Sequence, residues 1–327
     1  MRLSILSKGN VEKAARLATY SFSSLLGLDH SRIQSRWLEE IADLLDQPGS
    51  GGRLLEDREV TMGIVAWSML PWESKILGKQ MSTLRVLSVD RQSSNRDIYF
   101  DCLLKAALDS GSQNRNEFLL CKVSDRDDDK VSALIKNGFE LMDILVDFVY
   151  ALSKERSTGL QQKSVQGGFE LRLATVADVD SLAEIARASF ANHFGRFHSD
   201  RRIGREQATR IYEEWIRSCA FGWADWIILA VKDTRIAGYS AWKKPSSLDL
   251  RHNIRLAHYS IAGIHPDYFG KGLFTTLTRT GMEMMQGHAL WVEGPTHIDN
   301  HPVQRAYEKL GWQRVGTQTS FHKWLTK

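Results

Sequence analysis

A strand-helix-strand pattern occurs twice in this 327-residue chain, and it limits the possible folds more than any other feature. In the first copy, an apolar run at 118–123 precedes a helical pattern at 130–137. The pair Gly138-Phe139 and a second apolar run at 144–152 complete it. A pattern that recurs within one chain indicates repeated units of structure.

The second copy has the same order of elements. An apolar run at 289–292 precedes a helical pattern at 302–310, the pair Gly311-Trp312 and a strand that ends at 321–325. The glycine of each pair follows a helix, where a left-handed backbone favours glycine. The sequence therefore predicts an α/β chain with a mixed sheet, built from two domains of similar topology in tandem.

A polar segment at 153–168 separates the two copies. It is rich in Ser, Gln and Gly and has no apolar period, which is typical of a linker. The chain is also long enough for two domains with separate cores. We therefore expect one domain over 1–155, a linker over 156–168 and a second domain over 169–327.

Charge is distributed unevenly between the two halves. Residues 1–163 carry 22 Lys and Arg against 23 Asp and Glu, whereas residues 164–327 carry 21 against 16. A net charge of +4 is too small to indicate a nucleic-acid-binding protein. All histidines except His30 also lie in the second half, where we therefore expect an anionic ligand and proton transfer.

Several classes of protein are excluded by simple counts. Three cysteines without a CxxC pair make neither a disulfide framework nor a four-thiolate zinc site, so we expect no metal and a reducing cytoplasm. The apolar-leaning stretch at 17–28 is interrupted by Ser and Thr and lacks a cleavage site, so no signal peptide is expected. No apolar run approaches the 18 residues of a membrane span.

A Gly-Lys-Gly loop connects an expected strand at 255–264 to an expected helix at 273–286. Gly270 and Gly272 allow backbone N–H groups to converge, and the helix start adds a positive dipole end. Together they predict an anion site suited to a diphosphate. The spacing matches neither a Walker loop nor the dinucleotide fingerprint. A plain strand-turn-helix corner with a solvated Lys271 is the alternative.

A second element follows further along the chain. Asn300 and Pro302 predict the start of a helix, and Tyr307 lies two turns into it. Its phenol would then face the ends of the preceding strands. The alternative is a tyrosine that packs in the core.

Loop and helix together resemble the GNAT-type N-acetyltransferases, over residues 169–324. Members of that superfamily bind acetyl-CoA with a Q/R-x-x-G-x-G/A loop at a helix start and end with an N-x-x-A-x-x-x-Y-x-x-x-G-F element. Phe269 and Phe274 depart from the loop pattern, whereas both glycines are kept. The end element is represented by Asn300, Val303, Tyr307, Gly311 and Trp312.

This resemblance implies acetyl-CoA as co-substrate, bound by the strand end, the loop and the helix start. The residues that it implies for coenzyme binding are Ile261, Ala262, Gly263, Ile264, Phe269, Gly270, Lys271, Gly272, Leu273, Phe274, Asn300 and Tyr307.

Catalytic roles follow from the chemistry of N-acetylation. A phenol is neutral at pH 7, so Tyr307 suits the acid that protonates the leaving thiolate, and the resemblance implies the same role. A backbone N–H on the strand 259–264 would stabilise the oxyanion. His258, Glu293 and His297 are alternatives for the base, and so is a chain of water molecules.

The loop at 191–204 carries a narrower resemblance. Residues 190–198 and 212–216 are similar to the TDP-fucosamine acetyltransferase group, which N-acetylates a 4-amino sugar carried on a nucleotide, and residues 71–78 resemble a segment of that group's N-terminal domain. Guanidinium forks suit a diphosphate, although a solvated basic loop is the alternative. The expected acceptor-binding residues are Arg196, His198, Arg201, Arg202 and His297.

The first half has no second glycine loop. Residues 90–96 contain no glycine, so their backbone cannot easily curl around a diphosphate. We therefore expect the first domain to be a degenerate copy that completes the substrate cleft.

Three functions compete on these observations. The first is acetyl-CoA-dependent N-acetylation of a nucleotide-linked amino sugar, which the arginine-bearing loop favours over the second, N-acetylation of an amino acid, aminoglycoside or peptide N-terminus. The third is a non-catalytic acyl-CoA-binding module, which Tyr307 and Asn300 disfavour. The expected partners are acetyl-CoA and a small amine, without nucleic acid or membrane, in a monomer or homodimer.

Overall fold

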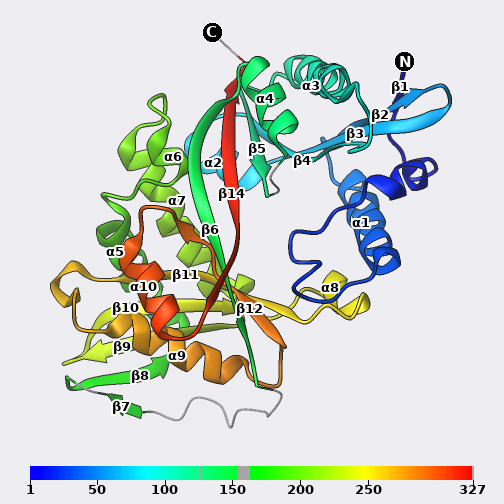
Figure 1. Cartoon of the computed structure of the whole chain (residues 1–327). Coiled ribbons are helices and arrows are strands. Elements are labelled where there is room, and N and C mark those ends of the chain that lie inside the picture. The colour runs from blue at the N-terminus through cyan, green and yellow to red at the C-terminus, as the bar shows by residue number, and fades with distance from the viewer. Residues whose placement is uncertain (125–126, 154–162, 166, 326–327) are drawn as a thin grey trace. The chain divides into compact units, whose positions relative to one another are not determined.

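The computed structural model describes residues 1–124, 127–153, 163–165 and 167–325, and it divides into two compact units (Figure 1). Unit 1 comprises Met1–Ile144 with Thr317–Lys327, and unit 2 comprises Leu145–Gly316. Both units are α/β with a mixed sheet, as the sequence predicts. Among the described residues, no helix combines the length and the apolar character needed to cross a membrane.

Unit 1 is a mixed sheet with helices on both faces. Val65 and Leu55 pack with helix α3, whereas their neighbours Ile64 and Leu54 pack with helix α1, as the alternation of side chains along a strand requires. In sheet order the strands are β1 (Arg2–Ile5), β2 (Gly51–Asp57), β3 (Val60–Met69), β4 (Met81–Val89), β5 (Phe118–Val123) and β14 (Gln313–Trp324). The helices are the 3-10 segment Val11–Leu17, α1 (His30–Leu45), α2 (Pro71–Leu77), α3 (Arg96–Gln113) and α4 (Asp128–Lys136).

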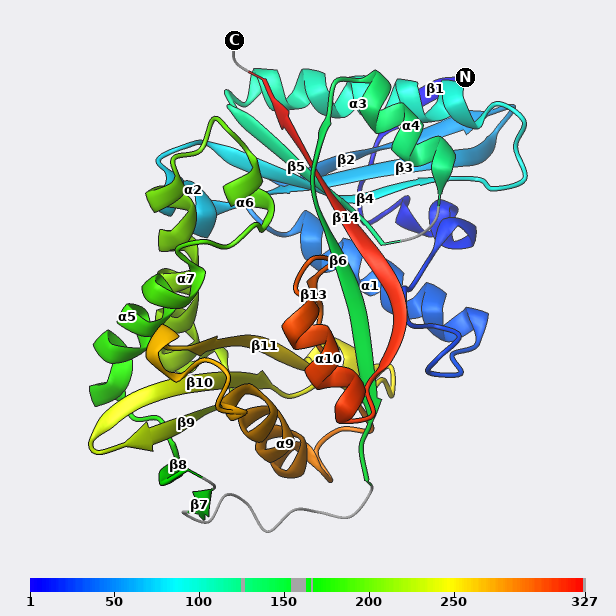
Figure 2. The same cartoon turned by 60° about the vertical axis from the view of Figure 1, so that its left-hand side comes forward.

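Unit 2 has the same plan (Figure 2). Ile228 packs with helices α9 and α10, whereas Leu229 packs with α5 and α7. Its strands are, in sheet order, β6 (Glu140–Ala151), β12 (Trp291–Glu293), β11 (Leu256–Ile264), β10 (Arg235–Lys243), β9 (Trp226–Lys232), β8 (Phe169–Leu173) and β7 (Lys163–Val165), with β13 (Thr296–His297) paired to β6. Its helices are α5 (Val179–Phe190), α6 (Arg196–Ser199), α7 (Arg205–Ser218), α8 (Ser247–Arg251), α9 (Leu273–Met285) and α10 (His301–Lys309), with short helical turns at Val176–Asp178, Cys219–Trp223 and Pro266–Tyr268.

The last strand of each repeat takes part in the other unit. Strand β6 belongs to unit 1 up to Ile144 and then pairs with β12 and β13 of unit 2. Strand β14 belongs to unit 2 up to Gly316 and then pairs with β5 of unit 1. The units therefore differ from the two consecutive domains, divided near residue 160, that the sequence predicts. The reason is that alternation of apolar residues identifies a strand but not the strand with which it pairs.

Local backbone predictions are confirmed where glycine is required, and two segments differ. Gly138 and Gly311 have φ of +76° and +85° after their helices. Within the expected linker 156–168, strand β7 pairs with β8, while residues 154–162 and 166 lie outside the described part. The loop expected at 191–204 contains α6, whose single turn is too short to show a helical period.

Candidate active site

Strands β11 and β12 pair only at their first three residues and then diverge. Their parallel pairing ends at His258 and Glu293. The N–H of Gly294 instead donates to the carbonyl of Phe148, 2.9 Å away, and β13 pairs with β6. From 259 to 264, β11 therefore has a strand partner only on its β10 side within the described chain, so its other edge offers backbone amides to an extended ligand.

A β-bulge lies where the two strands diverge. Ala241 faces Ile261 and Trp242 faces Tyr259, so Ser260 is an extra residue on β11. A bulge leaves its extra residue unpaired and redirects the strand. The divergence and the bulge together expose the backbone of β11 at one point.

The glycine loop forms a cradle of backbone donors beside this edge. Gly270 and Gly272 have φ of +74° and +73°, and a Cβ built on either meets no atom within 4 Å. Among the described residues, the N–H groups of 270–272 have no backbone partner, and α9 begins directly afterwards at Leu273 with further unpaired N–H groups. This arrangement fits an anionic group such as a diphosphate.

A cavity of about 540 Å³ brings most of the expected coenzyme-binding residues together. Nine of the twelve line it: Ala262, Gly263, Ile264, Phe269, Gly270, Gly272, Leu273, Phe274 and Asn300. The other three lie apart from its lining. Ile261 and Tyr307 are buried, and the ammonium of Lys271 lies 5.0 Å from the ring centre of Tyr268.

Residues that the sequence analysis missed also line this cavity. They come from the end of α5 and from the loop after it, where the sequence predicts acceptor binding: Ser189, Phe190, Asn192, His193 and Phe194. The available signal was the aromatic-rich run at 190–194, but a loop without a period does not show which way its side chains point.

Tyr307 is a buried tyrosine whose hydroxyl lacks a hydrogen-bond partner among the described residues. Its ring stacks on Trp312, with centroids 4.5 Å apart. Burial raises the pKa of the Tyr307 phenol well above its usual value of 10, so the group stays protonated. A Cβ at Gly294 would lie 2.7 Å from the hydroxyl, which places the phenol beside the residue that follows Glu293.

His258 and Glu293 form a pair at the point where β11 and β12 diverge. The Nδ1 of His258 lies 2.5 Å from the Oε1 of Glu293, across the last paired position of the two strands. Both side chains are partly exposed, at 32% and 17%. With Nδ1 held by the carboxylate, Nε2 is left for a substrate. The sequence offers these two residues as separate alternatives, and the structure joins them.

The expected acceptor-binding residues do not converge on one point. The Arg202 guanidinium pairs with Asp200 at 2.9 Å, and Arg201 is exposed with no ion pair in the described part of the chain. Arg196 is half-buried at the start of α6. Its guanidinium carbon lies 4.7 Å from the ring centre of Phe197.

Of the two histidines in this set, His198 is half-buried and His297 is buried. The Nε2 of His198 lies 3.1 Å from the hydroxyl of Thr209. Burial, aided by the charge of Arg205, lowers the pKa of His198 to about 4, so its ring is neutral. His297 accepts a hydrogen bond from the N–H of Asp299 and packs against Phe194, which lines the cavity. Across 1–124, 127–153, 163–165 and 167–325, no three His, Cys, Asp or Glu are grouped to hold a metal ion.

Known proteins resemble this chain both in its second half and over most of its length. Residues 169–313 match the model of the acetyltransferase (GNAT) domain family. The chain is 22% identical over 300 residues to the spore coat polysaccharide biosynthesis protein SpsD of Bacillus subtilis (strain 168), covering 90% of this chain and 93% of that protein.

Two solved structures share the fold. A tandem GNAT protein from the clavulanic acid biosynthesis pathway is 14% identical, with a TM-score of 0.58 over 100% of this chain and 99% of its own. A GCN5-related glucosamine N-acetyltransferase region of a fungal multi-domain β-N-acetylglucosaminidase is 10% identical, with a TM-score of 0.63 over 98% of this chain and 38% of its own. Residues 169–313 thus form a GNAT acetyltransferase domain.

Proposed function

We propose that this protein transfers the acetyl group of acetyl-CoA to the amine of a nucleotide-linked amino sugar. The observation that carries the proposal is the unpartnered phenol of Tyr307 beside Gly294, at the divergence of β11 and β12. A buried tyrosine hydroxyl usually has a hydrogen-bond partner, so a substrate group is expected to supply one.

Coenzyme binding follows from the groups around the cavity. The N–H groups of 270–272 and of the first turn of α9 would hold the diphosphate, and the open edge of β11 would pair with the amides of the pantetheine arm. When bound, acetyl-CoA supplies an activated acetyl thioester. Phe269 provides no polar side chain at the loop, so backbone donors carry the interaction.

Proton transfers are assigned to the pair and the phenol. His258 accepts the proton of the amine through Nε2, and Glu293 holds its Nδ1–H and stabilises the imidazolium. A backbone N–H of 259–264 stabilises the oxyanion. Tyr307 then donates its proton to the leaving thiolate, a role that suits a phenol kept neutral by burial.

The acceptor class rests on the relatives and on one arginine. SpsD is named for polysaccharide biosynthesis, and the fungal region is named a glucosamine N-acetyltransferase. Arg201 is an exposed cation suited to a phosphate. The pairing of Arg202 with Asp200 and the neutral ring of His198 reduce the positive charge of this segment, which favours an uncharged small amine as the second candidate.

A thiol-release assay distinguishes these acceptors. We expect turnover with a nucleotide-linked 4-amino sugar and much less with free amino sugars, amino acids or aminoglycosides. Arg201→Ala should raise the acceptor KM about tenfold and leave the acetyl-CoA affinity unchanged, because only the acceptor's phosphate loses a partner. Arg235→Ala, an exposed arginine of β10, is the control.

Two results would contradict the proposal. An unchanged acceptor KM in Arg201→Ala, combined with turnover of uncharged amines, would assign the second candidate. Absence of thiol release with every amine, despite bound acetyl-CoA, would identify a non-catalytic binding module.

A further inference from the structure

Unit 1 contains a second cavity at the point where its own parallel strands diverge. The pairing of β4 with β5 ends at Leu84 and Cys121. A cavity of about 660 Å³ is lined by the residues that follow on both strands, 85–88 on β4 and Lys122 on β5. This is the position that the coenzyme cavity occupies in unit 2.

The two openings also share the bulge. Ala66 faces Val86 and Trp67 faces Leu84, so Arg85 is an extra residue on β4, as Ser260 is on β11. In unit 1 the extra residue carries a guanidinium group, whereas in unit 2 it carries a small hydroxyl. The equivalent position is therefore positively charged in unit 1.

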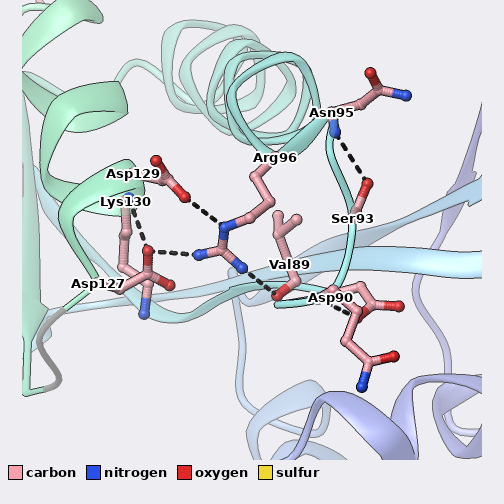
Figure 3. Close-up of polar contacts among 9 residues, drawn as sticks. Val89, Asp90, Ser93, Asn95, Arg96, Asp127, Asp129 and Lys130 are labelled. Atoms are coloured by element: carbon pink, nitrogen blue, oxygen red, sulfur yellow. Dashed lines mark hydrogen bonds and ion pairs between the residues drawn. The ribbon is translucent and has the colours of Figure 1, made fainter.

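The loop before α3 provides no anion cradle (Figure 3). The N–H groups of Gln92 and Asn95 donate to the side chains of Asp90 and Ser93, at 3.0 and 3.1 Å. The Arg96 guanidinium is held by Asp127 at 2.5 Å and by Asp129 at 2.6 Å. These two N–H groups are already used and two carboxylates lie at the helix start, which disfavours a phosphate there.

Side-chain cations surround the cavity instead. Five basic residues and one acid line it: Arg36, Arg85, Arg91, Lys122, Lys130 and Glu40. The Nε of Arg85 donates to the buried hydroxyl of Ser68 at 3.1 Å, which fixes the guanidinium. Because residues 1–163 carry 22 basic against 23 acidic residues, this excess is a local concentration of positive charge.

We propose that this cavity binds a small molecule that carries a nucleoside diphosphate, gripped by side-chain cations. Its aromatic lining supports this class, because the partly buried ring of Tyr20 stacks with a cation, and Arg36 already lies 4.6 Å from the centre of that ring. A sugar nucleotide and coenzyme A both contain a nucleoside diphosphate. The site is separate from the one proposed for catalysis in unit 2.

Calorimetry on the full chain tests the proposal with UDP and inorganic pyrophosphate as probes. The Gly272→Glu background removes binding at the unit 2 loop. In the Gly272→Glu protein we expect one UDP site to remain, with an affinity that depends on salt. The double substitution Arg85→Gln with Lys122→Gln should lower this UDP affinity at least about tenfold, because two charged donors are lost. Glutamine keeps an N–H near Ser68, and circular dichroism verifies folding.

The matched control removes two charges elsewhere in unit 1. Lys75→Gln with Lys105→Gln alters exposed lysines outside the cavity and should leave UDP affinity unchanged. Equal UDP affinity in the cavity variant and the control would overturn the proposal, and so would no UDP or pyrophosphate binding in the Gly272→Glu protein. Competition by coenzyme A but not by a nucleotide sugar would identify a second coenzyme site, and the reverse would identify an acceptor site.

Discussion

The cavity that we propose for the coenzyme in unit 2 and the basic cavity of unit 1 lie at equivalent diverging strands but offer different donors. In unit 2 the donors are backbone N–H groups, made available by Gly270 and Gly272. In unit 1 they are side chains such as Arg85, since two N–H groups of the loop already donate to Asp90 and Ser93. On this proposal, strand divergence determines where a ligand binds, and the loop sequence determines which groups bind it.

The strongest test of this comparison removes the backbone cradle. Gly272→Glu adds a carboxylate and a side chain at a left-handed position, so acetyl-CoA affinity should fall more than about a hundredfold by calorimetry. Gly78→Glu, at φ +63° in unit 1 and equally open, introduces the same charge and strain away from either cavity. Retained acetyl-CoA binding in Gly272→Glu would show that side chains suffice in both units.

Tyr307 tests whether unit 2 differs from unit 1 in chemistry as well as in binding. Tyr307→Phe keeps the ring stacked on Trp312 and removes the phenolic proton. We expect kcat to fall about 10²- to 10⁴-fold with unchanged acetyl-CoA affinity, the usual contribution of a positioned acid. With a thioester whose leaving thiol is more acidic, Tyr307→Phe should lower kcat by a smaller factor.

Tyr239→Phe is the matched control for that substitution. Tyr239 is also fully buried, and its hydroxyl also lacks a partner among the described residues, but it lies on β10 and not on α10 beside Gly294. Its kcat should stay near the wild-type value. Equal kcat in the two variants would make Tyr307 a packing residue.

The pair at the divergence of β11 and β12 is expected to have a smaller effect. Glu293→Gln keeps the shape and removes the charge that orients His258, so kcat should fall about tenfold to a hundredfold while the acetyl-CoA affinity is retained. Glu283→Gln, on the exposed face of α9, controls for loss of a carboxylate. An unchanged kcat in Glu293→Gln would assign the base to water or to another side chain.

The smallest expected effect concerns how the two units respond to acid. Burial lowers the pKa of His198 from 6.5 to about 4, so the unfolded chain binds a proton between these values and the folded chain does not. Unit 2 should therefore lose stability as the pH falls from 6.5 towards 4. In unit 1, burial raises the pKa of Asp127, but hydrogen bonds from Arg96 and the N–H of Lys130 outweigh it and lower the pKa below 3.8.

The contribution of Asp127 should therefore persist until the pH falls below about 3.8. Thermal unfolding at pH 7, 5 and 3 measures the loss of stability in both pH ranges, that of His198 and that of Asp127. His198→Gln should remove the loss between pH 6.5 and 4 and leave the loss at lower pH, with a shift in Tm of a few degrees. The same decline from pH 7 to 5 in wild type and His198→Gln would refute the assignment.

Much of the fold follows from sequence periodicity, and the rest depends on partners. The helix ends at Gly138 and Gly311 were predictable because glycine alone adopts their left-handed backbone without strain. The destination of β14 was not, because any strand with matching register can pair with the edge of β5.

The candidate site divides in the same way. The loop at 270–272 carries its own signal, since its donors come from local backbone conformation. The pairing of His258 with Glu293 depends on the parallel register of two strands far apart in the sequence, which no local pattern reveals. The cations around the unit 1 cavity come from α1, β4, the loop after β4, β5 and α4, and only the fold brings them together.

The pairing of β5 with β14 also bears on how the chain is made. Phe118 pairs with Trp324, roughly 200 residues later, so the sheet of unit 1 gains this strand only after nearly all of the chain described here has left the ribosome. Until then the edge of β5 is open to other strands. Strand pairing between residues so far apart in the sequence slows folding and exposes the nascent chain to mispairing. We therefore expect the incomplete sheet to bind chaperones during synthesis.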